Sequence, residues 1–265
     1  MLIIDSHVHT GENWSEPVDV LLRQMDSNGV GHAVIAGHNG NYDNRYLLDC
    51  MKRHEGRFKV VGLIDAQQPD SIATLERFHK DGGSGVRINL RKEMEWDPAD
   101  PLFRVMGELG LIVSVIGHAE NFAGARFKAL LDNCPGTHFC LEHLVRSPGD
   151  DVAEAPYGAY AGALECAKWP NTSVKVPGQG EILKKPGRLP VGYPWGDRVA
   201  PHYAMAKAAF GVQRMMWGSN FPPCAAKEGY RNALNGVRNM PLFQDGDDAE
   251  WVMGRTAAKL WGFAA

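Results

Sequence analysis

The sequence has little of what several classes of protein depend on. Its five cysteines are scattered and include no C-x-x-C pair, so neither a disulfide framework nor a zinc knuckle is expected. No apolar run reaches the ~18 residues of a membrane span, and the first apolar segment follows Met1 too closely to leave room for a signal peptide. We therefore expect a cytoplasmic protein with no membrane partner.

An excess of charge of one sign is also missing. The chain has 28 basic and 31 acidic residues, a formal net charge of −3, and no block of like charges. Nucleic acids and anionic membrane surfaces attract proteins that carry basic patches, so neither is an expected partner. A small-molecule substrate is the partner that we expect.

Apolar residues, in contrast, are plentiful and regularly spaced. With 265 residues, of which 44% are hydrophobic, the chain can bury a large core. Short apolar segments alternate with helical patterns, about 26 residues from one strand to the next. Eight strands, each followed by a helix, predict a (β/α)8 TIM barrel that forms a single domain over residues 1–265. A doubly wound sheet is the alternative, but no G-x-G-x-x-G turn follows the first strand.

Polar residues gather at the predicted strand ends, where barrels of this kind carry their active sites. In LIIDSHVHTG, residues 2–11, the side chains of Asp5, His7 and His9 have the same parity, so a strand would direct them to one face. An isolated His-X-His pair can arise by chance, but four of the ten histidines fall at strand ends. This convergence predicts a site at the barrel mouth. The other strand ends carry Asp65, Arg87, Asn89, His118, His143, Lys175, Ser219 and Asn220.

Five segments resemble the amidohydrolase superfamily, and more narrowly its lactonase-like branch, which includes 2-pyrone-4,6-dicarboxylate lactonases and sugar lactonases. They are IDSHVH, LEHLVRSP, NTSVKVPG, RMMWGSNFP and AEWVMGRTAAKLWGF, in the expected order over the whole chain. The resemblance implies a (β/α)8 barrel in which histidines from the first strand, a histidine from the fifth or sixth strand and an acid from the eighth surround the reacting carbonyl group.

The expected metal ligands follow from this resemblance. His7 and His9 match the histidines of the first strand and His143 matches that of the sixth. These three are the expected ligands of one divalent ion, zinc first, since neutral imidazoles suit Zn²⁺. Asn220 stands where many relatives have Asp. An amide carries no negative charge to neutralise a divalent ion, and it cannot take a proton from water as a carboxylate does. Activity without a metal is therefore the alternative.

The expected base follows from the same substitution. Because Asn220 cannot accept the proton of the attacking water, a histidine has to do so. We predict His143 as this base, His118 as the second choice, and Asn220 as the group that orients the water or the substrate carbonyl. Alternatively, the Asn220 side chain only forms hydrogen bonds with backbone groups at the end of the strand. Asp5 is expected to be a buried carboxylate that orients an imidazole or a backbone amide.

The expected reaction is hydrolysis of a small, carboxylated lactone or related cyclic ester. Arg87 would hold the substrate carboxylate, and Lys175 or Arg146 would add charge, although ion pairs inside the barrel are the alternative for Arg87 and Lys175. A metal-dependent decarboxylase or lyase and a catalytically silent ligand-binding barrel are the alternative functions. The irregular segment of residues 178–197 follows the seventh strand and is expected to form a lid or a wall of the pocket.

Overall fold

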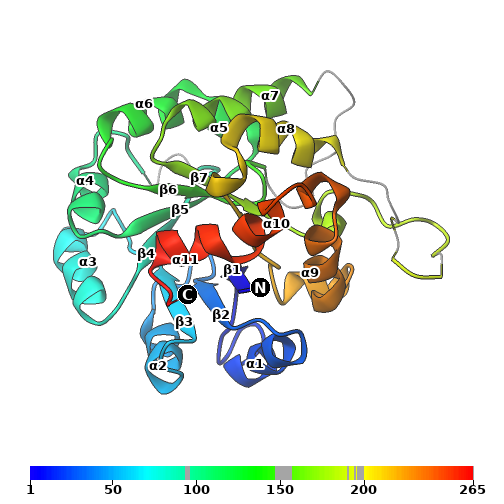
Figure 1. Cartoon of the computed structure of the whole chain (residues 1–265). Helices are drawn as coiled ribbons and strands as arrows, with labels where there is room; N and C mark the ends of the chain where they lie inside the picture. The colour runs from blue at the N-terminus through cyan, green and yellow to red at the C-terminus, as the bar shows by residue number, and fades with distance from the viewer. Residues whose placement is uncertain (93–95, 147–156, 190, 194, 196–199, 265) are drawn as a thin grey trace.

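The chain folds into a ring of eight parallel strands surrounded by helices (Figure 1). This computed structural model describes residues 1–92, 96–146, 157–189, 191–193, 195 and 200–264. The strands pair side by side in sequence order, so the predicted (β/α)8 barrel is confirmed. They are β1 (Ile4–Val8), β2 (His32–Ala36), β3 (Phe58–Gly62), β4 (Gly85–Asn89), β5 (Ile112–Ile116), β6 (Phe139–Leu141), β7 (Thr172–Val176) and β8 (Met215–Trp217).

The ring closes where the end of β1 meets the segment that follows β8. Val8 and Phe221 form a parallel bridge. The backbone N–H of Asn220 donates to the carbonyl of His7 at 2.9 Å, and the N–H of His9 donates to the carbonyl of Phe221 at 2.7 Å. Because these bonds join two of the predicted site segments, closure of the barrel brings the first-strand histidines next to Asn220.

The helices lie outside the ring and bury an apolar face against it (Figure 1). In α1 (Val18–Ser27), for example, Val18, Leu21 and Met25 are spaced by three and four residues and all three are buried. No helix within the described ranges is long and apolar enough to cross a membrane. The other α-helices are α2 (Arg45–Arg53), α3 (Ser71–Lys80), α4 (Pro101–Glu108), α5 (Ala119–Ala123), α6 (Ala125–Asn133), α7 (Gly158–Leu164), α8 (Pro201–Phe210), α9 (Tyr230–Arg238), α10 (Asp248–Glu250) and α11 (Thr256–Trp261).

The interior changes from apolar to polar along the barrel axis. A small apolar cluster that includes Ile4 and Met216 fills one end of the ring and packs against Trp261 of α11. Toward the carboxyl ends of the strands, polar side chains such as Arg87 and Lys175 are buried instead. Buried polar groups need partners, so these side chains form a network inside the barrel. Because active sites of such barrels lie at the carboxyl ends of the strands, we look for a functional site at this end.

The first strand is less regular than its sequence suggests. Its pairing with β2 shifts between Asp5 and Val8, so a single parity does not hold along the strand. Asp5 is fully buried, and its Oδ1 atom accepts hydrogen bonds from the backbone N–H groups of Ser219 at 2.8 Å and His7 at 3.2 Å. Burial raises the pKa of Asp5 to about 6. The expectation that Asp5 orients a backbone amide is confirmed.

Candidate active site

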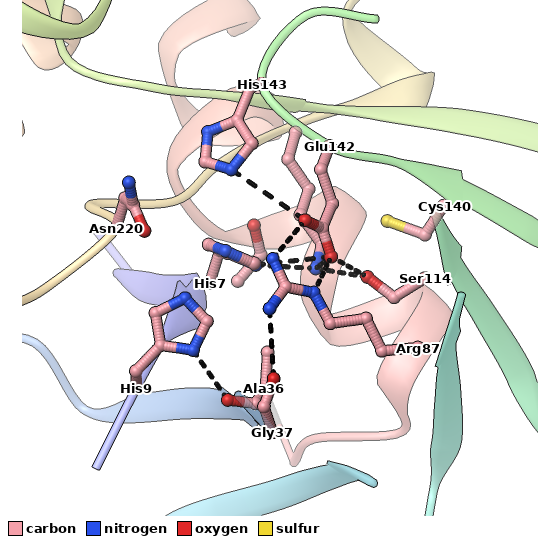
Figure 2. Close-up of polar contacts among 12 residues, drawn as sticks. His7, His9, Ala36, Gly37, Arg87, Ser114, Cys140, Glu142, His143 and Asn220 are labelled. Atoms are coloured by element: carbon pink, nitrogen blue, oxygen red, sulfur yellow. Dashed lines mark hydrogen bonds and ion pairs between the residues drawn. The ribbon is translucent and has the colours of Figure 1, made fainter. Parts of the chain in front are cut away.

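The first-strand histidines meet the histidine of the sixth strand at the barrel mouth (Figure 2). The ring centroids of His7 and His9 are 4.8 Å apart, and those of His7 and His143 are 5.0 Å apart. All three side chains are buried. A fourth ring, His38 at the end of β2, stacks on His9 with centroids 4.7 Å apart. The structure thus brings together three histidines that the sequence singled out and adds His38, which was not among the predicted site residues.

Hydrogen bonding assigns the proton of His9 to one ring nitrogen. Its Nδ1 atom lies 2.6 Å from the carbonyl oxygen of Ala36. Because a carbonyl only accepts, Nδ1 carries the proton and Nε2 carries the lone pair of the neutral ring. Burial, and then the charge of Arg87, hold the pKa of His9 well below its usual range, so the ring is neutral at pH 7.

A buried carboxylate, Glu142, lies at the centre of the charged groups (Figure 2). Arg87 binds it with two hydrogen bonds, from Nε to Oε1 at 2.9 Å and from Nη2 to Oε2 at 2.7 Å. The hydroxyl of Ser114 donates to Oε1 at 2.8 Å. Burial raises the pKa of Glu142, but the charges of Arg87 and Lys175 outweigh that effect and hold the pKa well below its usual range. Glu142 is therefore an anion at neutral pH.

Lys175 connects this anion to the histidines. Its Nζ atom donates to the Ser114 hydroxyl at 2.7 Å, lies 3.0 Å from Nδ1 of His7, and lies 3.9 Å from Oε1 of Glu142. Both Lys175 and Arg87, which were expected to hold a substrate carboxylate, therefore have partners inside the barrel. That arrangement is the alternative considered for them, and the role of carboxylate clamp stays a prediction.

A second buried carboxylate, Glu181, was not expected. It belongs to the short 3-10 helix Gln179–Glu181, so the described part of the segment after β7 reaches the site. Residues 190, 194, 196 and 197 of that segment lie outside the described residues. Oε2 of Glu181 lies 3.1 Å from Nδ1 of His143, and Oε1 accepts a hydrogen bond from Nδ2 of Asn220 at 2.6 Å.

The charge state of Glu181 follows from its neighbours. Burial raises its pKa, but His143, Lys227 and the Asn220 amide together lower it to about 2. Nζ of Lys227 lies 3.3 Å from Oε1. Glu181 is therefore an anion beside an imidazole. The sequence signal for Glu142 is its place as an acid directly after a strand, next to His143 itself. Glu181 lies five residues after β7, in the irregular segment, and has no comparable signal.

The other two predicted site residues make contacts of a supporting kind. The ring of His118 accepts a hydrogen bond from the backbone N–H of Asn121 and so caps α5. Arg146 is buried, and its Nη1 atom donates to the carbonyl of Glu181 at 3.3 Å. Arg146 therefore supports the segment that carries Glu181, and the catalytic role of His118 and the substrate-binding role of Arg146 both stay predictions.

Among the residues that the structure describes, the side chains that could hold a metal ion are His7, Glu142 and His143, whose ligand atoms lie within 4.8 Å of one another. This group shares His7 and His143 with the predicted ligand set and does not include His9. As arranged, it does not fit a divalent ion, because both oxygens of Glu142 are bound by Arg87 and the amine of Lys175 lies 3.9 Å from Oε1 of Glu142. Lys175 also faces Nδ1 of His7, which leaves Nε2 as the ring nitrogen of His7 that could serve as a ligand. A divalent cation here would lie beside two buried positive groups. We therefore assign no step to a metal.

Comparison with known proteins finds a family that matches nearly the whole chain. The family model described as amidohydrolase matches residues 4–263. A Pseudomonas putida structure described as a candidate 2-pyrone-4,6-dicarboxylic acid hydrolase is 23% identical, with 100% of this chain and 98% of that chain covered and a TM-score of 0.78. A zinc-bound amidohydrolase from Burkholderia multivorans is 19% identical over 100% of both chains, with a TM-score of 0.80.

A solved decarboxylase structure has a similar fold. The 5-carboxyvanillate decarboxylase of Sphingomonas paucimobilis is 14% identical over 99% of both chains, with a TM-score of 0.69. No curated protein gives a significant match. At these identities the solved structures show a shared fold, and the reaction has to be argued from the site.

Proposed function

Because this chain belongs to the amidohydrolase family, we propose that it is a hydrolase that opens a small, carboxylated lactone by attack of water at the barrel mouth. The observation that carries the proposal is the pairing of His143 with Glu181, whose Nδ1 and Oε2 atoms are 3.1 Å apart. A carboxylate can only accept at this contact, so Nδ1 carries the proton and Nε2 is left with a lone pair. His143 is then the base that takes a proton from water.

Glu181 has a second effect on this base. When His143 becomes an imidazolium ion, the adjacent carboxylate stabilises the new charge, as in other acid–histidine pairs. Asn220 holds Glu181 in place through its 2.6 Å hydrogen bond. The amide that replaces the usual acid thus acts as a positioning residue, and the proton is taken by the histidine.

His7 is the group that we assign to the carbonyl oxygen. The ammonium of Lys175 donates toward Nδ1, so the proton of the neutral ring lies on Nε2. Nε2 is buried and has no hydrogen-bond partner within the described part of the chain. An N–H group in that position can donate to the oxyanion that forms when water attacks.

The reaction balances with these groups alone. The oxygen of water bonds to the carbonyl carbon while His143 takes one proton. The ring C–O ester bond then breaks, and the departing oxygen recovers the proton from the imidazolium of His143. The product is a hydroxy acid, or its enol or keto form, with one more carboxylate than the substrate.

The test is a lactone panel that includes 2-pyrone-4,6-dicarboxylate and sugar lactones, followed by acid release at constant pH. Wild-type turnover is expected, and Glu181→Gln should lower kcat by ~10²-fold or more, since the base loses its orienting carboxylate. Glu228→Gln is the matched control, because Glu228 binds the same segment through the N–H of Gly180 and the hydroxyl of Tyr193. Release of CO2 without acid would instead support a decarboxylase, and binding without turnover a silent barrel.

A further inference from the structure

Two groups of opposite charge compete for one ring nitrogen of His7. Burial, and then the charge of Lys175, hold the pKa of His7 well below its usual range, so the ring is neutral and has a single N–H group. Nζ of Lys175 lies 3.0 Å from Nδ1, and Oε1 of Glu142 lies 3.8 Å from the same atom. The two groups favour opposite tautomers, because an ammonium donates to an unprotonated Nδ1 whereas a carboxylate accepts from a protonated one.

The group that wins this competition decides what His7 can do. Lys175 lies within hydrogen-bond distance of Nδ1 and Glu142 does not. With Lys175 as the donor, the proton of the ring lies on Nε2, which can then donate to a substrate oxygen. If Glu142 took its place, the proton would move to Nδ1, and Nε2 would carry a lone pair that accepts a proton or binds a metal ion.

Ser114, on β5, keeps Lys175 on the side of His7. Its hydroxyl group has one proton, which it donates to Oε1 of Glu142 at 2.8 Å (Figure 2). The hydroxyl oxygen therefore accepts from Nζ of Lys175, at 2.7 Å. The hydroxyl group thus bridges the two charges, whose Nζ and Oε1 atoms are 3.9 Å apart. Its removal would let the ammonium approach Glu142 directly and leave Nδ1 of His7.

These four side chains form a network that is closed to water. Ser114, Glu142, His7 and Lys175 are each at most 2% exposed. A hydrogen bond that is lost in such surroundings is not replaced by one to bulk water, so each donor affects its neighbours strongly. Arg87 binds both oxygens of Glu142. Glu142 therefore keeps its position when Ser114 or Lys175 is replaced.

We propose that Lys175 and Ser114 are positioning residues that set the tautomer of His7. They make its Nε2–H group a donor to the substrate oxyanion and exclude a divalent cation from the ring. The inference rests on the proposed function, since it concerns the oxyanion donor of that reaction. A metal ion would need a lone pair on Nε2, which this tautomer does not have. The presence of Lys175 thus explains why a histidine at the position expected for a metal ligand acts as a hydrogen-bond donor.

The experiment reads the tautomer directly, by long-range ¹⁵N–¹H NMR of protein labelled at histidine, with the His7 signals identified by their loss in His7→Asn. Protonated and unprotonated ring nitrogens have well-separated ¹⁵N shifts, and the wild type should show a protonated Nε2 and an unprotonated Nδ1. In Ser114→Ala the form with the proton on Nδ1 should become detectable. In Lys175→Met it should predominate, because Glu142 is then the partner of Nδ1.

A matched control is present in the same barrel. Ser173, on β7, is also a buried serine whose hydroxyl group contacts a histidine, since its Oγ atom lies 2.9 Å from Nε2 of His138. His138 directly precedes β6, at the amino end of that strand. Ser173→Ala should therefore leave the signals of His7 unchanged and alter those of His138.

Two further measurements test the consequences of the tautomer. Lys175→Met should bind zinc at least ~10-fold more tightly than the wild type in titration calorimetry, because Nε2 gains a lone pair and Glu142 orients the ring from behind. The same variant should lower kcat for lactone hydrolysis by ~10²-fold, since the oxyanion loses its donor. Ser114→Ala removes only a hydroxyl group, so it provides the decisive result if Lys175→Met does not fold.

The outcomes that contradict the proposal are distinct from those that contradict the function. A proton on Nδ1 in the wild type, unchanged His7 signals in Ser114→Ala, or an unchanged zinc affinity in folded Lys175→Met would each overturn the proposal. The expected tautomers without hydrolysis of any lactone would refute the proposed function alone. Lactone hydrolysis by a wild-type protein that carries the proton on Nδ1 of His7 would refute the tautomer assignment alone.

Discussion

Arg87→Met separates a structural role of this residue from a role in substrate binding. Arg87 makes two hydrogen bonds to Glu142, at 2.9 and 2.7 Å, and both side chains are buried. The substitution leaves a buried anion whose remaining cationic partner among the described residues is Lys175, with Nζ 3.9 Å from Oε1 of Glu142. Removing one partner of such a pair destabilises a protein by ~3–5 kcal/mol. For a chain of this length that corresponds to a fall in Tm of about 10 °C.

The assay is urea unfolding followed by circular dichroism, with thermal melting in parallel. The matched control is Arg45→Met, because Arg45 also binds an acid, Asp43, through Nε at 2.9 Å and Nη2 at 2.6 Å, but on the surface. No measurable change in Tm is expected there. The double variant Arg87→Met with Glu142→Leu should recover part of the lost stability, since no unpaired carboxylate is left.

The same variant has a clear opposite outcome. If Arg87 is the substrate clamp, Arg87→Met should keep its Tm and raise KM for a carboxylated lactone far more than for its ester. That result would refute the reasoning from the buried pair. The pH dependence adds a check: since the pKa of Glu142 is held low, its stabilising contribution is present above its unfolded pKa and is lost only as the pH falls through the lower folded value.

Three further predictions use other parts of the site. Asn220→Ala should lower kcat by ~10²-fold with little change in Tm, because Glu181 loses a donor; a large loss of stability with normal turnover per folded molecule would make Asn220 a structural residue. The purified protein should bind less than one zinc ion per chain by metal analysis and keep its activity in a chelator, and a stoichiometric site, or a gain of zinc affinity in Asn220→Asp, would show that the histidines form a metal site. Burial, and secondarily the charge of Glu181, raise the pKa of Glu228 to about 7. The contribution of Glu228 to stability is therefore present at low pH and is lost as the pH rises through 7. Glu228→Gln should flatten the fall in unfolding free energy between pH 5 and 8, and an unchanged slope would contradict this.

The barrel and the meeting of the histidines could be anticipated from the sequence because both depend on local patterns. The spacing of apolar residues that are close in sequence predicts the strands and helices. Parallel strands in a closed barrel place their carboxyl ends at one rim. The order of the elements therefore predicts that His7, His9 and His143 lie at the same rim of the barrel. The expected positions of Arg87 and Lys175 inside the barrel follow from the same rule.

The partners of those residues were decided only by the tertiary structure. Whether Arg87 meets a substrate or Glu142 depends on the register of β4 against the end of β6, 55 residues further along the chain. Glu181 enters through a segment with no regular period, and its contact with His143 depends on how that segment folds back over the mouth. Periodicity carries no information about such contacts, because ion pairing and tautomer choice are set by distances between residues far apart in sequence. The sequence alone thus determined the barrel and the position of the three histidines at its mouth. Only the folded chain decided which groups form ion pairs and which ring nitrogen of each histidine carries the proton.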